Sequence, residues 1–300
     1  MVHVTKNKFA RQEMRTKKLP RFEVLASAIL IIGGAFTTLI VSGIVPQILQ
    51  RPGPVQDPGK WKLVFDDEFN ESTLDLSKWS YNYPADWPHG GHTLNHDAYM
   101  DEANVFIENG LLRIKAENQR DPNAPPPENT SYGWLTYNYT AGAINTLGKF
   151  SAKYGYFEAR MKLPGSTGFW PAFWTLNAAG GWPPEIDIHE WLSNEPSTLH
   201  CTFHWSENGT HKMSSQGIEG LPDLSKDFHI YGLEWTPDSL TWYFDNIPVR
   251  SYDNSATISQ LQAQYIIINL AVGGWAKTPD ASTIWPAYFD TDWVRVWQAA

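Results

Sequence analysis

Short segments in which apolar and polar residues alternate recur from Trp61 to the C-terminus, and this period of two constrains the fold most strongly. In residues 156–163 every second side chain is apolar, and residues 112–116 and 240–244 repeat the pattern. Such alternation is typical of strands with one face in a core. Residues 265–272 are nearly all apolar, as expected for a strand buried on both faces. With no break in composition, residues 61–300 are predicted to form one large all-β sandwich.

Turn and helix signals subdivide this region. Asp245-Asn246 separates residues 240–244 from 247–252 and predicts a hairpin. Residues 255–264 are expected to contain a short helix. Residues 121–131 are rich in Pro and Asn and are expected to form a surface loop.

The first 60 residues have a different composition. Residues 1–21 carry seven basic side chains against Glu13 alone, and Val24–Val45 is an uncharged, mostly apolar run of 22 residues, long enough to cross a hydrocarbon core as a helix. A basic flank before such a run predicts that the N-terminus lies inside and the rest outside. We therefore expect a basic cytoplasmic tail at residues 1–21, a transmembrane signal anchor at 22–45, a Pro/Gly-rich stalk at 46–60 and a catalytic domain at the cell surface. Secretion after signal cleavage is the alternative.

The charge and the cysteine content narrow the partners. Subtracting the +6 of the tail from the net charge of −9 leaves −15 on the remainder, which argues against nucleic acid and favours a neutral polysaccharide over a sulfated one. Cys201 is the only cysteine, so the chain has no internal disulfide, and we expect Cys201 to be buried. We expect a monomer. Asn-x-Ser/Thr triplets, which are potential glycosylation sites, occur at Asn70, Asn129, Asn138 and Asn208.

The stretch Glu185-Ile186-Asp187-Ile188-His189-Glu190 contains three carboxylates within six residues. Glu185 and Asp187 share one face of a strand, whereas Glu190 would fall on the other face. One bulged residue near His189 would return Glu190 to the acidic face. Glycoside hydrolysis needs such a row, with one carboxylate ionised and another protonated. A solvated acidic strand edge and a cation site are the alternatives.

Tryptophans crowd the acidic stretch, and sugar rings can stack on their indole faces while the indole N–H donates to hydroxyls. Trp174, flanked by Phe173 and Leu176, is expected in the core or on the floor of a cleft. A solvated acidic edge would have no use for this group of tryptophans. The group consists of Trp170, Trp174, Trp182 and Trp191.

Several motifs occur along the chain in a characteristic order. They are W-K-L-V-F-D-D-E-F at 61–69, K-Y-G-Y-F-E-A-R at 153–160, G-F-W-P-A-F-W at 168–174, the acidic motif, N-L-A-V-G-G-W at 269–275 and D-W-V-R-V-W at 292–297. Together they resemble glycoside hydrolase family 16, the laminarinase-like β-glucanases. The resemblance implies a jelly-roll sandwich of two curved antiparallel sheets with a concave sugar-binding cleft. The E-x-D-x-x-E spacing resembles laminarinases, agarases and carrageenases.

The resemblance also implies roles for individual residues. Glu185 matches the nucleophile, Glu190 the general acid/base and Asp187 the assisting carboxylate of a retaining mechanism. The negative charges of Glu185 and Asp187 would keep Glu190 protonated until Glu185 becomes esterified. His204 matches a cleft histidine, a structural histidine being the alternative, whereas His189 receives no chemical role. The implied substrate-binding residues are Trp170, Trp174, Trp182, His204 and Trp275, with Tyr99 and Asn95 at the cleft edge.

No cofactor is expected for catalysis, but relatives often hold a structural calcium. Glu68, the backbone of Gly110 and Asp292 match its oxygen ligands. Two unrelated surface acids and a turn glycine are the alternative. Ala141-Gly142-Ala143 stands where relatives often have Ser-Gly-Arg, so a cleft arginine is absent.

The predicted function is endo-acting hydrolysis of β-1,3- or mixed β-1,3/1,4-glucan. A cell-wall glucan transglycosylase is one alternative, and the same chemistry on β-galactan, agar or carrageenan is another. A non-catalytic glucan-binding receptor is disfavoured because both motif glutamates are present.

Overall fold

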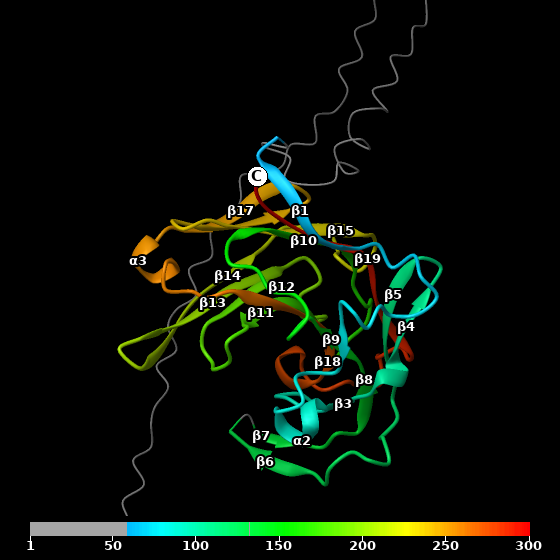
Figure 1. Cartoon of the computed structure of the whole chain (residues 1–300). Coiled ribbons are helices and arrows are strands. Elements are labelled where there is room, and N and C mark those ends of the chain that lie inside the picture. Colours follow the sequence, from blue (N-terminus) through cyan, green and yellow to red (C-terminus); the bar gives the residue numbers. More distant parts are fainter. Residues whose placement is uncertain (1–58, 132) are drawn as a thin grey trace, which may run out of the picture.

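A computed structural model describes residues 59–131 and 133–300, and these residues form a sandwich of two antiparallel β-sheets. Figure 1 shows the two sheets as stacked layers, with β10, β15 and β17 in one and β11–β14 in the other. The all-β prediction is therefore confirmed. The predicted tail, the predicted anchor and most of the predicted stalk lie outside the described residues. None of the helices within the described ranges has the length and apolar character needed to span a membrane.

The first sheet has eight strands, and the end of the chain runs through its middle. β19 pairs with β10 on one side and with β5 and β1 on the other. In spatial order its strands are β17 (Ile247–Tyr252), β16 (Leu240–Phe244), β15 (His229–Trp235), β10 (Gly155–Lys162), β19 (Ala287–Ala299), β5 (Leu111–Ala116) and β4 (Val105–Glu108), with β1 (Trp61–Asp67) also paired to β19.

The second sheet has seven strands and contains the acidic stretch as β12. Its interior strand β18 is buried along all nine residues, as its continuous apolar run predicted. In spatial order the strands are β14 (Thr210–Ile218), β13 (Leu199–Glu207), β12 (Glu185–Glu190), β11 (Phe169–Asn177), β18 (Gln264–Val272), β9 (Ala143–Asn145) and β2 (Ser80–Tyr81).

The remaining elements are short. β3 (Ala98–Met100) pairs in parallel with β8 (Tyr139–Ala141), and β6 (Glu128–Thr130) forms a hairpin with β7 (Gly133–Leu135). α2 (Pro88–Gly91) lies beside that hairpin in Figure 1, and its His89 bonds Glu128 of β6 at 2.9 Å. The helical turns η1 (Glu102–Asn104), α3 (Ser255–Ile258) and η2 (Gly274–Ala276) complete the described chain.

The sequence analysis located several of these elements and misjudged one in part. The predicted hairpin is confirmed, because Phe244 pairs with Ile247 across the Asp245-Asn246 turn. The short helix predicted within residues 255–264 is confirmed as the single turn α3, and the chain rejoins the sheet at Gln264. The loop predicted at residues 121–131 is irregular over residues 121–127 and then forms strand β6, which pairs with β7 at the surface.

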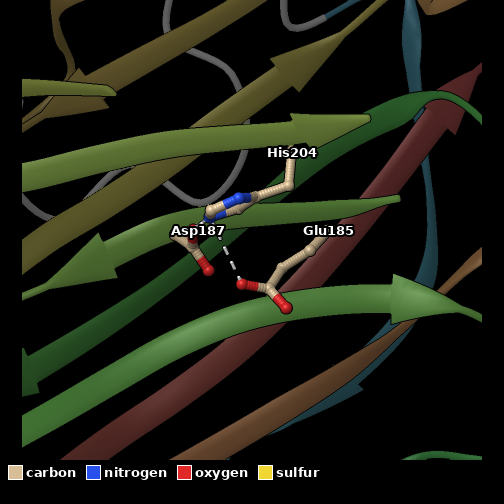
Figure 2. A group of neighbouring side chains, drawn as sticks. All are labelled: Glu185, Asp187 and His204. Atoms are coloured by element: carbon tan, nitrogen blue, oxygen red, sulfur yellow. Dashed lines mark ion pairs between the residues drawn. The ribbon is translucent and has the colours of Figure 1, made fainter. Parts of the chain in front are cut away.

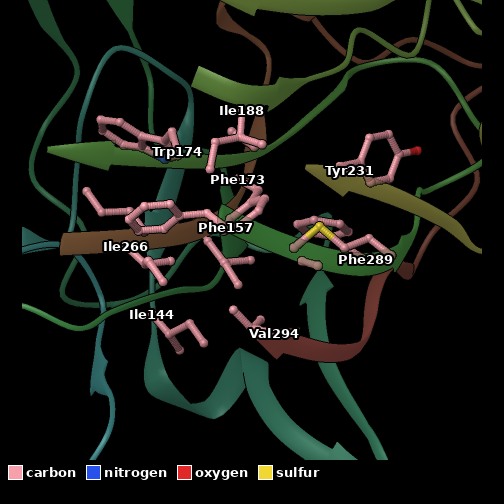
Figure 3. Packing of buried hydrophobic residues seen from close by; sticks show 14 of the residues in the cluster. Ile144, Phe157, Phe173, Trp174, Ile188, Tyr231, Ile266, Phe289 and Val294 are labelled. Atoms are coloured by element: carbon pink, nitrogen blue, oxygen red, sulfur yellow. The ribbon is translucent and has the colours of Figure 1, made fainter. Parts of the chain in front are cut away.

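Apolar side chains from both sheets meet in one core between the layers. Phe157 and Val294 come from the eight-stranded sheet, and Phe173 and Ile266 come from the facing strands (Figure 3). Cys201 is buried in this core, as predicted. Because the core occupies one face of the seven-stranded sheet, the polar residues that alternate with it must lie on the opposite face.

Candidate active site

A bulge in β12 brings the three carboxylates to one face of the seven-stranded sheet. Phe173 pairs with His189 and the adjacent Trp174 pairs with Asp187, so Ile188 is the extra residue on β12. Against β13 the register also shifts between Asp187 and Glu190. Ile188 and His189 are both buried on the core side. The bulge predicted from the odd spacing is therefore confirmed, and we call Glu185, Asp187 and Glu190 the acidic row.

Two side chains from other strands bond the backbone carbonyls that the bulge leaves unpaired. Trp242 Nε1 of β16, in the opposite sheet, donates to the Asp187 carbonyl at 2.8 Å. The Cys201 thiol of β13 donates to the Ile188 carbonyl at 3.8 Å. A buried carbonyl without a partner would be unfavourable, so these contacts stabilise the bulge and tie the acidic row to the core.

Glu185 lies between an indole and an imidazole. Trp182 Nε1 donates to Glu185 Oε2 at 2.9 Å, from a loop just before β12, and the Trp182 side chain is 53% exposed. On the other side, Nε2 of His204 lies 3.6 Å from Glu185 Oε1. N–H groups directed at a carboxylate favour its ionised form, as a nucleophile requires.

His204 lies on β13 opposite Glu185 and contacts two members of the acidic row. Its Nε2 is 3.4 Å from Asp187 Oδ2 as well as 3.6 Å from Glu185 Oε1 (Figure 2). The three side chains are only 16%, 4% and 17% exposed for His204, Asp187 and Glu185. One ligand atom from each lies within 4.8 Å of the others. The cation-site alternative of the sequence analysis falls on these same atoms.

Glu190, at the other end of the row, lies beside two more tryptophans. Trp170 Nε1 donates to Glu190 Oε1 at 3.1 Å. The Trp170 ring packs edge-on against Trp275 of η2, with ring centroids 5.8 Å apart, and Trp275 is 44% exposed. The predicted residues Trp170, Trp182 and Trp275 therefore flank the acidic row, two at its Glu190 end and one at its Glu185 end.

The environment raises the pKa values of both glutamates. For Glu190, burial and then the charge of Asp187 raise the pKa well above its ordinary value, and bonds from Trp170 and Thr202 oppose the shift. For Glu185, burial followed by the charges of Asp187 and Glu190 raises the pKa, the Trp182 bond opposes the rise, and a hydrogen bond with Asp187 adds to it. Three buried acids cannot all ionise together, so the row retains a proton. Glu190 is the better site for this proton because His204 approaches Glu185 and Asp187.

The other predicted substrate-binding residues make their side-chain and backbone contacts with other groups. Trp174 is buried opposite Asp187 and donates to Asn269 Oδ1 at 2.7 Å, so it belongs to the floor of the acidic face. The Asn95 carbonyl lies 2.8 Å from the position a Cβ would take on Gly274, beside Trp275. Tyr99 is buried and stacks on His92 at 4.6 Å, instead of contacting the acidic row.

The residues predicted to bind calcium contact arginines. Both oxygens of Glu68 accept hydrogen bonds from Arg295, at 2.7 and 2.8 Å. Asp292 Oδ2 accepts from Arg160 at 2.6 Å, and Gly110 lies in the turn between β4 and β5. Guanidinium groups therefore bond both carboxylates in the described structure, and calcium at this position stays a prediction.

The sequence analysis missed three polar residues on the acidic face. His200 and Thr202 alternate with core residues on β13 and pair with Glu190 and Asp187. His211 of β14 bonds His204 at 2.9 Å. The signal for His211 was available: Asn208-Gly209 is a strong two-residue hairpin motif, which sets Ser206 opposite His211 and therefore His211 diagonally beside His204.

The comparisons with known proteins agree with this geometry. The profile described as "Glycosyl hydrolases family 16" matches residues 93–295. A glucan endo-1,3-beta-glucosidase of Niallia circulans is 35% identical over 79% of this chain, which spans 38% of that protein. A beta-glucanase of Rhodothermus marinus is 32% identical, with 79% of this chain and 85% of that protein covered.

A solved structure extends the similarity to three dimensions. The endo-beta-1,3-glucanase of Pyrococcus furiosus aligns with a TM-score of 0.67 at 35% identity, covering 81% of this chain and 97% of that one. The solved structures similar to this chain are jelly-roll glucanases, which confirms the jelly-roll prediction. The fold, the acidic row and the matched profile lead to one conclusion: the chain belongs to glycosyl hydrolases family 16.

Proposed function

We propose that the protein is a retaining endo-glycoside hydrolase of β-1,3- or mixed β-1,3/1,4-glucan. The observation that carries the proposal is the pairing of each terminal glutamate of the acidic row with a tryptophan, Glu185 with Trp182 and Glu190 with Trp170. These indoles, together with Trp275, offer apolar platforms to sugar rings on both sides of the acids. The relatives named above as glucanases support glucan as the polymer.

The mechanism uses the acidic row in two displacements. Glu185 attacks the anomeric carbon while the Glu190 carboxyl gives its proton to the departing glycosidic oxygen. Esterification removes the charge of Glu185, so the pKa of Glu190 falls and Glu190 becomes a base. Water then loses a proton to Glu190 as its oxygen attacks the anomeric carbon and releases Glu185. Glucanases of family 16 need no cofactor for this chemistry.

Glu185→Gln tests the proposal directly. We expect wild type to release reducing ends from laminarin or lichenan, and Glu185→Gln to reduce kcat by roughly a thousandfold or more. The assay includes galactan, agarose and carrageenan, which represent the alternative polymers. Glu234→Gln, in the opposite sheet, is the matched control and should retain activity. Equal inertness of wild type and Glu185→Gln on every polymer would contradict the proposal.

Analysis of the products separates hydrolysis from transfer. Mass spectrometry with and without an oligosaccharide acceptor should show products no longer than the input if water is the acceptor. Products longer than the input would indicate a transglycosylase, which uses the same two glutamates.

We also propose that the enzyme is a monomer held at the cell surface by residues 22–45. A basic segment followed by an uncharged run of 22 residues supports this placement. The net charge of −15 beyond the tail supports a neutral glucan as partner and argues against nucleic acid.

A further inference from the structure

We propose that His211 is a positioning residue, which donates a hydrogen bond to His204 and thereby holds His204 neutral with its proton directed at the acidic row. Nε2 of His211 lies 2.9 Å from Nδ1 of His204, and the two rings are nearly parallel, 21° apart, with centroids separated by 5.1 Å. His211 does not contact substrate in this assignment. The effect of His211 on kcat rests on the proposed function, whereas the placement of the His204 proton does not.

The proposed charge of His204 fixes which ring nitrogen carries its proton. Nε2 of His204 faces Asp187 Oδ2 at 3.4 Å and Glu185 Oε1 at 3.6 Å, and ionised carboxylates only accept hydrogen bonds. Nε2 of His204 therefore carries a proton. The neutral His204 of the proposal has this one proton, so its Nδ1 is an acceptor and Nε2–H of His211 is the donor, whereas a charged His204 would reverse this bond.

The surroundings of His211 favour its neutral form. Burial and the neighbouring His204 both lower the pKa of His211. On the other side the Trp182 ring lies 4.5 Å away, and it offers no charge. Lys212 points to the opposite face of β14 and reaches Glu207 of β13 at 3.9 Å. Two adjacent imidazolium ions would repel each other, so the pair holds no more than one extra proton.

A neutral His204 matters because it leaves the negative charge of Asp187 uncompensated. The negative charge of Asp187 helps to raise the pKa of Glu190, which must hold the proton that the leaving group receives. An imidazolium beside Asp187 would cancel much of that charge. His211 thus acts on Glu190 indirectly, through His204 and Asp187, from strand β14 on the same face of the sheet.

His211 also packs against Trp182, so the experiment must separate packing from hydrogen bonding. His211→Phe keeps a ring against Trp182 but has no donor, whereas His211→Gln restores an N–H near the position of Nε2. We expect His211→Phe to lower kcat on laminarin roughly tenfold with little change in KM, and His211→Gln to recover most of the loss. His204→Gln should also lower kcat, and adding His211→Phe to it should cause no further loss.

Histidine tautomers measured by ¹⁵N NMR give a readout that needs no substrate. In wild type, His204 should carry its proton on Nε2 with Nδ1 unprotonated, and His204→Gln identifies the signal by its absence. His211→Phe should increase the tautomer protonated at Nδ1. A wild-type His204 protonated at Nδ1 overturns the proposal, as does multiplicative loss of kcat in the double variant. If the wild-type enzyme cleaves no polymer but His204 shows the expected tautomer, the glucanase proposal is refuted and the assignment of His211 stands.

Discussion

At the scale of the residue, His189 is a polar side chain that the bulge turns into the core. Its ring packs 4.3 Å from Tyr231 and 6.3 Å from Phe289, and neither ring nitrogen has a hydrogen-bond partner among the described residues. Burial, and then the nearby His200, lower the pKa of His189 to about 3. His189 therefore stays neutral at working pH and is assigned no chemistry, in agreement with the sequence analysis.

Replacing His189 by methionine should stabilise the protein. An unsatisfied buried polar group costs about 1–3 kcal/mol, and methionine removes it at similar volume. The folded-state pKa is depressed, so the unfolded chain binds the proton more tightly and wild type loses up to about 1.4 kcal/mol per pH unit below about 6.5. The gain in unfolding free energy should thus widen between pH 7 and pH 4, as measured by urea denaturation.

The control for this comparison is His229→Gln. His229 is bonded to Asp245 at 2.8 Å, so its replacement should cost stability of about 1 kcal/mol. A constant or negative gain for His189→Met across the pH range would mean that the buried imidazole has a partner or is already protonated.

At the scale of the element, a glycine turn sets the position of Trp275. Gly273 has φ 74°, and a Cβ there would lie 2.8 Å from Asp97 Oδ2. Asp97 cannot easily move, because Oδ1 accepts from Thr136 N and Oγ1 at 2.8 and 3.0 Å, and its own N–H donates to the Val272 carbonyl. The turn between β18 and η2 is therefore held by both the side chain and the backbone N–H of Asp97.

Gly273→Ala should displace η2 and weaken substrate binding. The substitution adds both a positive-φ strain and a clash, so we expect a loss of stability greater than about 1 kcal/mol and a higher KM on laminarin with a smaller effect on kcat. Gly148→Ala is the control, since φ is 73° there but no atom lies within 4 Å of the added Cβ. Equal effects of the two substitutions on KM would refute a role for the turn in placing Trp275.

At the scale of the whole molecule, the two ends of the described chain are joined. Trp61 of β1 pairs with Ala299 of β19, and the Ala300 N–H donates to the Lys60 carbonyl at 2.8 Å. Figure 1 shows the C-terminus beside the start of β1. Phe65 of β1 also stacks on Phe150 at 4.5 Å inside the core. The first strand is thus part of the domain.

Chains of three lengths should separate folding from anchoring. Residues 59–300 should be recovered in the soluble fraction with the same glucanase activity as the full chain, which should sediment with membranes and require detergent for release. Residues 68–300 lack β1, leave β19 partly unpaired, and should aggregate. A full chain that remains soluble after its N-terminus is shown to be intact would contradict the anchor.

The sequence by itself determined the class of fold and the identity of the acids. Period-two alternation located β5, β10 and β16, because burial of one strand face imposes that period. The odd spacing of Glu190 predicted a bulge, because three carboxylates on one face admit few other backbone paths. The resemblance to the family supplied the roles of the acids.

Only the tertiary structure decided what surrounds those acids. The partners of Glu68 and Asp292 come from strands far apart in the sequence. Periodicity specifies which face a side chain occupies, but the order and register of neighbouring strands specify which side chain it meets. For this reason the acidic row could be read from one strand, whereas its proton assignments required the packed sheet.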